Sequence, residues 1–173
     1  MTTVLNPIGK VPTTPPRPLN PIPNLSGKTI VLLDNSKHNA DALLERIKAQ
    51  VDAQFSDITW RYERKRGGGY PMGDEIKGRI VSEADLVLAS SADCGCTSWS
   101  AGDTVELEAA GIPTVLFATT PFYELAKGLC AGQGYADARI IEVEHPLGGM
   151  FPADIDDRAA GVADTVTAVL NSK

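Results

Sequence analysis

The residues with the clearest chemical capacity are two cysteines separated by one glycine, in SADCGCTSWS, residues 91–100. A thiolate is a strong nucleophile and a metal ligand, and its pKa falls near cations and helix N-termini. Three cysteines in the whole chain do not make a disulfide framework. We therefore predict that Cys94 and Cys96 are reactive thiols, with inert packing as the alternative. Cys130 lies on a predicted helix face and is expected to be a core residue.

Strand and helix patterns alternate along the chain from Lys28 onward. Strands are predicted over 29–33, 58–65, 85–90, 114–119 and 139–144, and helices over 40–55, 73–84, 102–110, 122–134 and about 155–170. This alternation predicts an α/β fold, a three-layer doubly wound parallel sheet. The second and fifth strands alternate or carry charge, as edge strands do, whereas the others are continuous apolar runs. The expected order is 2-1-3-4-5, the flavodoxin-like order, with a ligand crevice beyond the carboxyl ends of strands 1 and 3.

Four loops leave the carboxyl ends of strands 1, 3, 4 and 5, at residues 34–41, 91–100, 119–122 and 145–149. We expect their polar side chains to meet at the crevice. The candidate catalytic residues are Cys94, Cys96 and His145, the last as a general acid or base. The candidate substrate-binding residues are Asp34, Asn35, Lys37, Asn39, Thr97, Ser98 and Thr119. As alternatives, Asp34 and Asn35 shape a turn, and His145 caps a strand end.

A helix is expected to start just after the cysteines. Thr97, Ser98 or Ser100 is the expected N-cap, and Ser100 with Asp103 has the spacing of a capping box. A thiolate there would gain from the unpaired amides and the helix dipole. The glycine triplet at 67–69 has no following Lys-Ser/Thr, so we expect a mobile loop rather than a phosphate cradle.

The N-terminal region has a different composition from the rest. Seven of the twelve prolines fall within residues 1–27, which predicts an extended arm ahead of a single α/β domain at 28–173. Apolar side chains at intervals favour a strap across the domain or a neighbouring subunit over a disordered tail. These anchors are Val4, Leu5, Ile8, Leu19, Ile22 and Leu25. A partner subunit or a homo-oligomer through this arm is the expected assembly.

Charge and motif content exclude several function classes. The net charge is −6 with no basic cluster, so neither nucleic acid nor an anionic membrane is an expected partner. No apolar run approaches the roughly 20 residues of a membrane helix, and we predict a cytoplasmic protein. No Gly-x-Gly-x-x-Gly or hydroxyl-rich loop follows the first strand, so no nucleotide or flavin cofactor is expected. Zinc on Cys94, Cys96 and His145 is an alternative, although zinc ligands usually have wider spacing.

Several stretches together resemble the UGSC family, which is named for a selenocysteine-Gly-Ser-Cys motif. They are DCGCTSWS, VELEAAGIPTV, HPLGG and LLDNSKHNADALL, within about residues 28–150. The resemblance places Cys94 at the selenocysteine position and Cys96 at the second thiol. Here the motif is one residue shorter, and His38 replaces the usual proline. A disulfide across one residue forms only with strain.

The motif is also similar to the selenocysteine-x-x-Cys-Thr motif of the selenoprotein subunit of glycine and betaine reductases. That likeness implies nucleophilic or redox chemistry on a small substrate. The sequence therefore predicts a thiol-dependent enzyme, an oxidoreductase or lyase acting on a small carboxylate or carbonyl compound. The alternatives are a non-catalytic substrate-binding subunit of a multi-component enzyme and a Cys/His zinc protein.

Overall fold

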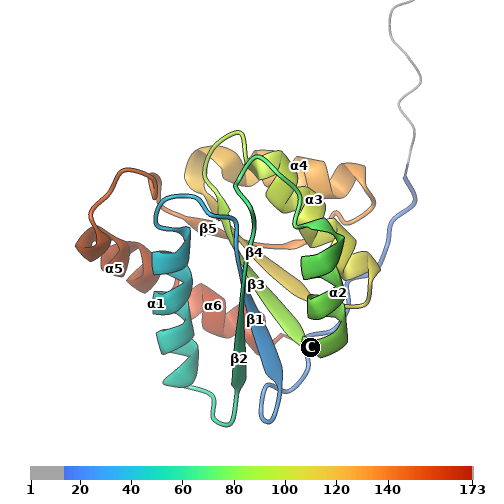
Figure 1. Ribbon diagram of the computed structural model, residues 1–173, viewed down its shortest axis with the longest axis horizontal. Coiled ribbons are helices and arrows are strands. Elements are labelled where there is room, and N and C mark those ends of the chain that lie inside the picture. Colours follow the sequence, from blue (N-terminus) through green and yellow to red (C-terminus); the bar gives the residue numbers. More distant parts are fainter. Residues whose placement is uncertain (1–13, 173) are drawn as a thin grey trace, which may run out of the picture.

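The computed structural model describes residues 14–172 and has the predicted three-layer α/β architecture (Figure 1). Its strands are β1 (Thr29–Asp34), β2 (Thr59–Arg64), β3 (Leu86–Ala92), β4 (Thr114–Thr119) and β5 (Arg139–Val143). Its helices are α1 (Ala40–Asp52), α2 (Gly73–Glu83), α3 (Thr97–Ala109), α4 (Thr120–Gly132), α5 (Pro152–Ala160) and α6 (Ala163–Leu170). Every predicted strand is present within two residues of its expected bounds.

The sheet is parallel, and its order β2-β1-β3-β4-β5 confirms the predicted flavodoxin-like order. Every residue of β3 and β4 is buried, and β1 is buried except at its first residue. The edge strand β2 is mostly exposed. Central strands are covered on both faces, which is why they read as continuous apolar runs. The polar loops after β1, β3, β4 and β5 consequently leave from one end of the sheet.

Helices cover both faces of the sheet, and alternate strand residues pack against them. Ile30 and Leu32 of β1 belong to the core beneath α1, α5 and α6, and Val31 and Leu33 to the core beneath α2, α3 and α4. Figure 1 shows these two helix groups on opposite sides of the strands. The side-chain period of two along each strand thus builds two apolar layers. Together they fix the ends of β1, β3, β4 and β5 around the candidate site.

Several helix boundaries differ from the expectation, and α1 ends at Asp52, three residues before its expected end. α3 begins at Thr97, not near residue 102, because Gly102 is accommodated inside the helix. α4 begins two residues early, with Pro121 in its first turn, where a missing amide hydrogen costs nothing. The expected final helix is two helices, α5 and α6, separated at Gly161 and Val162.

The expected caps of α3 are wrong. Its N-cap is Cys96, and no side chain bonds to the helix start. The Thr97 hydroxyl instead donates to the carbonyl of Cys94, at 2.6 Å. A hydroxyl that bonds a carbonyl three residues earlier is satisfied locally and does not cap the helix amides. The expected partner Asp103 pairs with Lys65, not with the helix start.

Residues 14–27 run in extended form along the domain, while the anchors Val4, Leu5 and Ile8 lie outside the described residues. Ile22 and Leu25 are buried in the core beneath α1 and α6. The amide of Arg17 donates to the carbonyl of Gly134 at 2.8 Å. A Cβ on Gly134 would lie 2.6 Å from the carbonyl oxygen of Pro15, and its φ is +97°. Glycine at that position therefore lets this half of the arm lie against its own domain.

None of the helices formed by residues 14–172 is long and apolar enough to cross a membrane.

Candidate functional site

The cysteine loop is the turn between β3 and α3, and it points the Cys94 thiol at the start of the helix. The backbone amide of Cys96 donates to Cys94 Sγ at 3.3 Å, and the two Sγ atoms are 3.1 Å apart. Cys94 is partly exposed, whereas Cys96 is buried and reaches the carbonyl of Ser91 at 3.4 Å. The structure therefore gives the two thiols different surroundings although only Gly95 separates them.

These surroundings shift the two pKa values in opposite directions. Burial opposes ionisation of Cys94, but the amide and thiol of Cys96 and the positive charge of Lys37 together hold its pKa below the ordinary value. Burial raises the pKa of Cys96, and the neighbouring Cys94 sulfur raises it further. Burial and the nearby Glu108 raise the pKa of Cys130 to about 11. Cys94 is thus the thiol whose ionised form the fold favours.

The loop after β1 brings Lys37 to the cysteines. Asn35 holds it there: its Oδ1 accepts the Lys37 amide at 3.1 Å, and its Nδ2 donates to the carbonyl of Ser91 at 2.6 Å. The same Nδ2 lies 3.3 Å from the hydroxyl oxygen of Ser100 in α3. Asn35 is therefore a bridge between the two loops, and its amide is occupied by protein atoms.

Asp34 is fully buried, and its carboxylate also contacts other groups of the protein. Its carboxylate accepts the Ser36 amide at 2.7 Å and the Tyr62 hydroxyl at 2.5 Å, and it lies 3.3 Å from Nε of Arg64. These contacts fix the exit of β1 against the edge strand. They also raise the pKa of Tyr62, mainly through burial and then through the Asp34 carboxylate.

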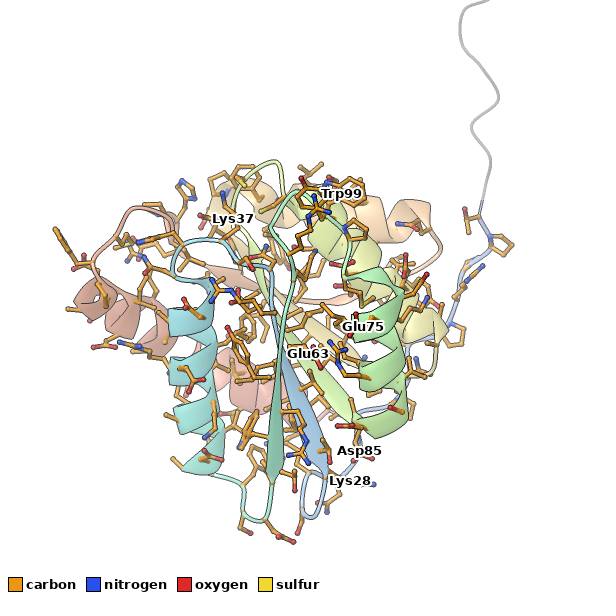
Figure 2. All side chains as sticks on the ribbon, viewed as in Figure 1. Lys28, Lys37, Glu63, Glu75, Asp85 and Trp99 are labelled. Atoms are coloured by element: carbon orange, nitrogen blue, oxygen red, sulfur yellow. The ribbon has the colours of Figure 1, made fainter. Side chains whose placement is uncertain are left out.

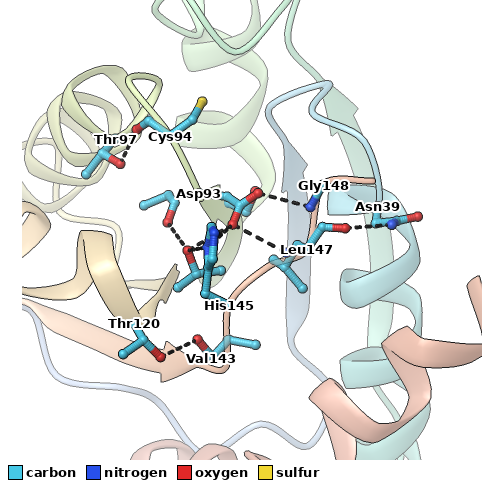
Figure 3. A network of polar contacts seen from close by, with 12 residues as sticks. Asn39, Asp93, Cys94, Thr97, Thr120, Val143, His145, Leu147 and Gly148 are labelled. Carbon is cyan, nitrogen blue, oxygen red and sulfur yellow. Dashed lines mark hydrogen bonds and ion pairs between the residues drawn. The ribbon is translucent and has the colours of Figure 1, made fainter. Parts of the chain in front are cut away.

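Asn39 ties the first loop to the last one. It adopts a left-handed conformation with φ of 65° at the N-cap of α1. Its Nδ2 donates to the carbonyl of Leu147 at 2.7 Å (Figure 3) and to the carbonyl of Met150 at 3.0 Å. A short polar side chain tolerates this backbone region better than most residues. Asn39 therefore positions the 145–150 loop beside the Lys37 loop.

A second polar cluster surrounds Asp93, directly before Cys94. Its carboxylate accepts the Thr119 hydroxyl at 2.9 Å and the Gly148 amide at 3.0 Å, and Oδ1 lies 3.1 Å from Nδ1 of His145. In Figure 3 the imidazole faces Asp93, while the Cys94 sulfur points away from it. With Nδ1 directed at the carboxylate, the other ring nitrogen of this partly exposed histidine is open to a ligand.

The glycine triplet closes the other side of the cysteine loop. Gly68 is buried, and a Cβ on it would lie 2.8 Å from Lys37 Cδ and 3.2 Å from Cys96 Cβ. Gly69, by contrast, has open space around its Cβ position. The loop after β2 therefore packs against both the lysine and the cysteines, a contact that the sequence reading did not predict.

An open groove of about 680 Å³ lies beside the Lys37 loop. It is lined by Ser36, Lys37, His38, Asn39, Asp41, Ala42, Glu45, Arg46, Arg64 and Pro152. Lysine and arginine side chains give it a basic character, which Asp41 and Glu45 partly offset. Lys37 is the residue that the groove shares with the thiol site, because neither cysteine lines it.

The part of the chain that the structure describes contains no preformed set of ligands for the zinc alternative. No three His, Cys, Asp or Glu side chains there are grouped closely enough to hold a metal ion. Cys94 and Cys96 are adjacent, but Nδ1 of His145 is directed at Asp93.

The predicted residues thus fall into two groups. Cys94, Cys96 and Lys37 form one group, and Thr119 and His145 form another around Asp93. The rest support the loops: Asp34, Asn35 and Asn39 as described, Thr97 on the Cys94 carbonyl, and exposed Ser98 3.3 Å from the Gly95 carbonyl. Substrate binding by any of them stays a prediction.

Sequence reasoning missed Asp93 and Gly68. Asp93 had a usable signal, because it directly follows β3 at the carboxyl end of the sheet, where Asp34 is the last residue of β1. Nothing in the sequence beyond the glycine triplet itself indicated a role for Gly68, because its burial follows from packing between distant loops.

Comparison with known proteins places the chain in a family. Among solved structures it is similar to a short-chain flavodoxin associated with a bacterial microcompartment. That likeness has a TM-score of 0.45 and 9% identity, over 83% of this chain and 98% of that one. No curated protein matches. The model of the UGSC family matches residues 3–172, nearly the full length. The chain belongs to the UGSC family.

Proposed function

We propose that the chain is a thiol-dependent enzyme in which Cys94 is the nucleophile toward a small carbonyl or carboxylate compound. The observation that carries this proposal is the position of Cys94 Sγ, 3.3 Å from the backbone amide of Cys96, the N-cap of α3, and within the field of Lys37. An amide at a helix start and a nearby cation both favour the thiolate, which is the reacting form.

The surrounding groups have separate roles in this proposal. The Cys94 thiolate forms a carbon–sulfur bond with the carbonyl carbon, and the π electron pair moves onto the oxygen. Lys37 then pairs with the resulting oxyanion, which is the transition-state charge that such sites stabilise. Cys96 keeps its proton, as its raised pKa favours, and supports the Cys94 anion from 3.1 Å.

His145 is assigned proton transfer to or from the bound substrate. Its contact with Asp93 directs Nδ1 inward, which leaves Nε2 as the exchanging atom. Thr119 and Asp93 therefore act as positioning residues for the imidazole. A substrate lying between Cys94 and His145 would contact both polar groups at once.

The pH dependence of alkylation tests the proposal. In a Cys96→Ser variant, iodoacetamide should modify Cys94 with a midpoint below the ordinary thiol value of about 8.5, because the ionised fraction rises through the lowered pKa. Peptide mass spectrometry follows Cys94, with Cys130 as the control in the same sample. Cys130 should stay unmodified near neutral pH because its pKa is raised to about 11. A Cys94 midpoint at or above 8.5 would contradict the proposal.

A second candidate is a substrate-holding subunit whose partner supplies the chemistry. Two aromatic side chains favour it, because Tyr70 of the glycine-containing loop and Trp99 of α3 are 46% and 44% exposed. Aromatic residues are enriched at the cores of protein interfaces. Turnover of a substrate by the purified chain alone would reject this candidate.

A further inference from the structure

The segment between β2 and α2, residues 66–72, is here named the glycine loop. Its Gly68 is buried against Lys37 and Cys96, the two residues that flank the Cys94 thiol. A Cβ at position 68 would approach Lys37 Cδ to 2.8 Å and Lys37 Cγ to 2.9 Å. Real Cβ atoms do not come so close, so only a glycine leaves the lysine stem where it is.

Both ends of the glycine loop are fastened to α3, the helix that begins at the cysteines. Lys65, directly before the loop, pairs with Asp103, and both side chains are almost fully buried. At the other end, the amide of Met72 donates to Asp103 Oδ1 at 2.9 Å. One buried carboxylate thus holds both ends of the loop. Removing either partner of such a pair is costly, so the loop has a fixed position.

The loop is also closed on itself. The amide of Tyr70 donates to the carbonyl of Gly67 at 3.2 Å, and the Arg66 guanidinium lies 4.3 Å from the centre of the Tyr70 ring. The predicted mobile loop is therefore a turn with defined internal contacts. Gly68 is its point of closest approach to the thiol site.

We propose that the glycine loop is a fixed wall that holds the Lys37 stem beside Cys94, with Gly68 as a positioning residue for the reactive thiol. The inference rests on the proposed function, because it takes Cys94 as the nucleophile. The effect is steric. With only hydrogen at position 68, the Lys37 stem stays in contact with the glycine loop, whereas a methyl group there displaces the stem. The lysine stem is flexible, so the displacement moves the ammonium group without unfolding the domain.

The test compares alanine at positions 68 and 69 in the full chain. Gly68→Ala should lower the rate of Cys94 alkylation at pH 7 by about 3- to 10-fold and move the midpoint to higher pH, since one pKa unit is tenfold in thiolate population near neutral pH. Gly69→Ala is the matched control, because nothing lies within 4 Å of its Cβ position. Its rate should stay within about twofold of the parent rate.

A Lys37→Met background shows whether the effect passes through the lysine. That variant should itself react more slowly, and adding Gly68→Ala should then produce no further loss. Equal rates for Gly68→Ala and the parent, or an equal loss in the Gly69→Ala control, would overturn the inference. So would a further loss in the Lys37→Met background.

The two proposals fail in different ways. If the pH midpoint of Cys94 alkylation in the parent chain is 8.5 or higher, the proposed function is wrong. If that midpoint is low but Gly68→Ala leaves it unchanged, only the positioning role of the glycine loop is wrong. Should Gly68→Ala fail to fold, nuclear Overhauser contacts in the unmodified protein replace it. Cross-peaks between the Gly68 α-protons and the Lys37 side-chain methylenes are expected, and their absence would overturn the inference.

Discussion

The two ends of the sheet both contain buried carboxylates, but they use them differently. At the amino end, Glu108 accepts the backbone amides of Asn20 and Thr114, at 2.9 and 3.0 Å, and pairs with Arg139 at 3.0 Å. At the carboxyl end, Asp93 accepts the Thr119 hydroxyl and the Gly148 amide and faces His145. These partners of Glu108 are backbone amides and an arginine, whereas one partner of Asp93 is an imidazole, a group able to serve in general acid–base chemistry.

Figure 2 shows the same contrast among charged side chains. Lys28 and Asp85 lie together at the amino end, where they pair at 3.0 Å, and Lys37 lies at the opposite end. Lys37 makes no ion pair with a carboxylate among residues 14–172, and its charge acts on Cys94 instead. The amino end is thus closed by complementary charges, whereas Lys37, Cys94 and His145 gather at the carboxyl end.

The largest effect is expected from Glu108→Ala at the amino end. It leaves Nη1 of Arg139 and two backbone amides without their buried acceptor, so the free energy of unfolding should fall by about 3–5 kcal/mol. Urea denaturation measures this loss. The alkylation midpoint of Cys94 should not change, because the two sites lie at opposite ends of the sheet.

Glu106→Ala is the matched control on the same helix. Glu106 is half exposed and pairs with Lys77 at 3.2 Å, so its loss should cost only about 0–1 kcal/mol. A Glu108 variant as stable as the Glu106 variant would show that the arm contact contributes little, and the contrast between the two ends would weaken.

At the carboxyl end, Asp93→Ala should cost about 2 kcal/mol, because the Gly148 amide and the Thr119 hydroxyl lose their acceptor. It should also change the ¹⁵N chemical shifts of the His145 ring, since the carboxylate that favours hydrogen on Nδ1 is gone and only the Thr119 hydroxyl, 3.1 Å from Nδ1, remains. Asp93→Asn, which keeps one acceptor oxygen, should fall between the parent and Asp93→Ala. Unchanged imidazole shifts in both variants would remove the positioning role of Asp93.

Among the buried or half-buried carboxylates compared, Asp85→Ala is expected to have a small effect. The Thr29 amide first, and then Lys28, hold the pKa of Asp85 below its usual range against the opposing effect of burial. The pair is about one-third exposed, so the loss should be only about 1 kcal/mol at pH 7.

The difference in stability between the parent chain and Asp85→Ala has a predictable pH dependence. A carboxyl group with a lowered folded-state pKa stabilises the protein above its unfolded pKa of about 3.9, and the benefit is lost as the pH falls through the folded value. Thermal melts of the parent and of Asp85→Ala should therefore converge in strong acid. A gap that stays constant down to the lowest pH would show that the contact is not ionic.

The sequence predicted the sheet and its strand order because the burial of a strand imposes a pattern of apolar residues along it. β3 and β4 each contain a continuous apolar run, at 86–89 and 115–118, and β2 alternates, which distinguishes central from edge strands without any three-dimensional information. Helix ends were less predictable. Thr97 has the composition of a cap, but its hydroxyl bonds Cys94 instead, and residue type alone does not distinguish these two uses.

The sequence predicted where the candidate site lies, but not which of its side chains contact one another. The doubly wound order places Cys94 and Lys37 at one end of the sheet, and the structure brings their side chains together. The same rule brings His145 to that end, but it does not say that the ring faces Asp93. Partners on separate loops depend on backbone conformations, such as the left-handed Asn39, that carry no periodic signal.

By itself, the sequence determined which segments are central, which are edges, and that two thiols follow the third strand. Those features depend on short-range patterns of apolar and polar residues, which each segment carries alone. Only the tertiary structure decided that Gly68 packs on Lys37 and that Asp93 receives His145. Such contacts join loops that are far apart along the chain, and they form because the packed sheet fixes where each loop begins.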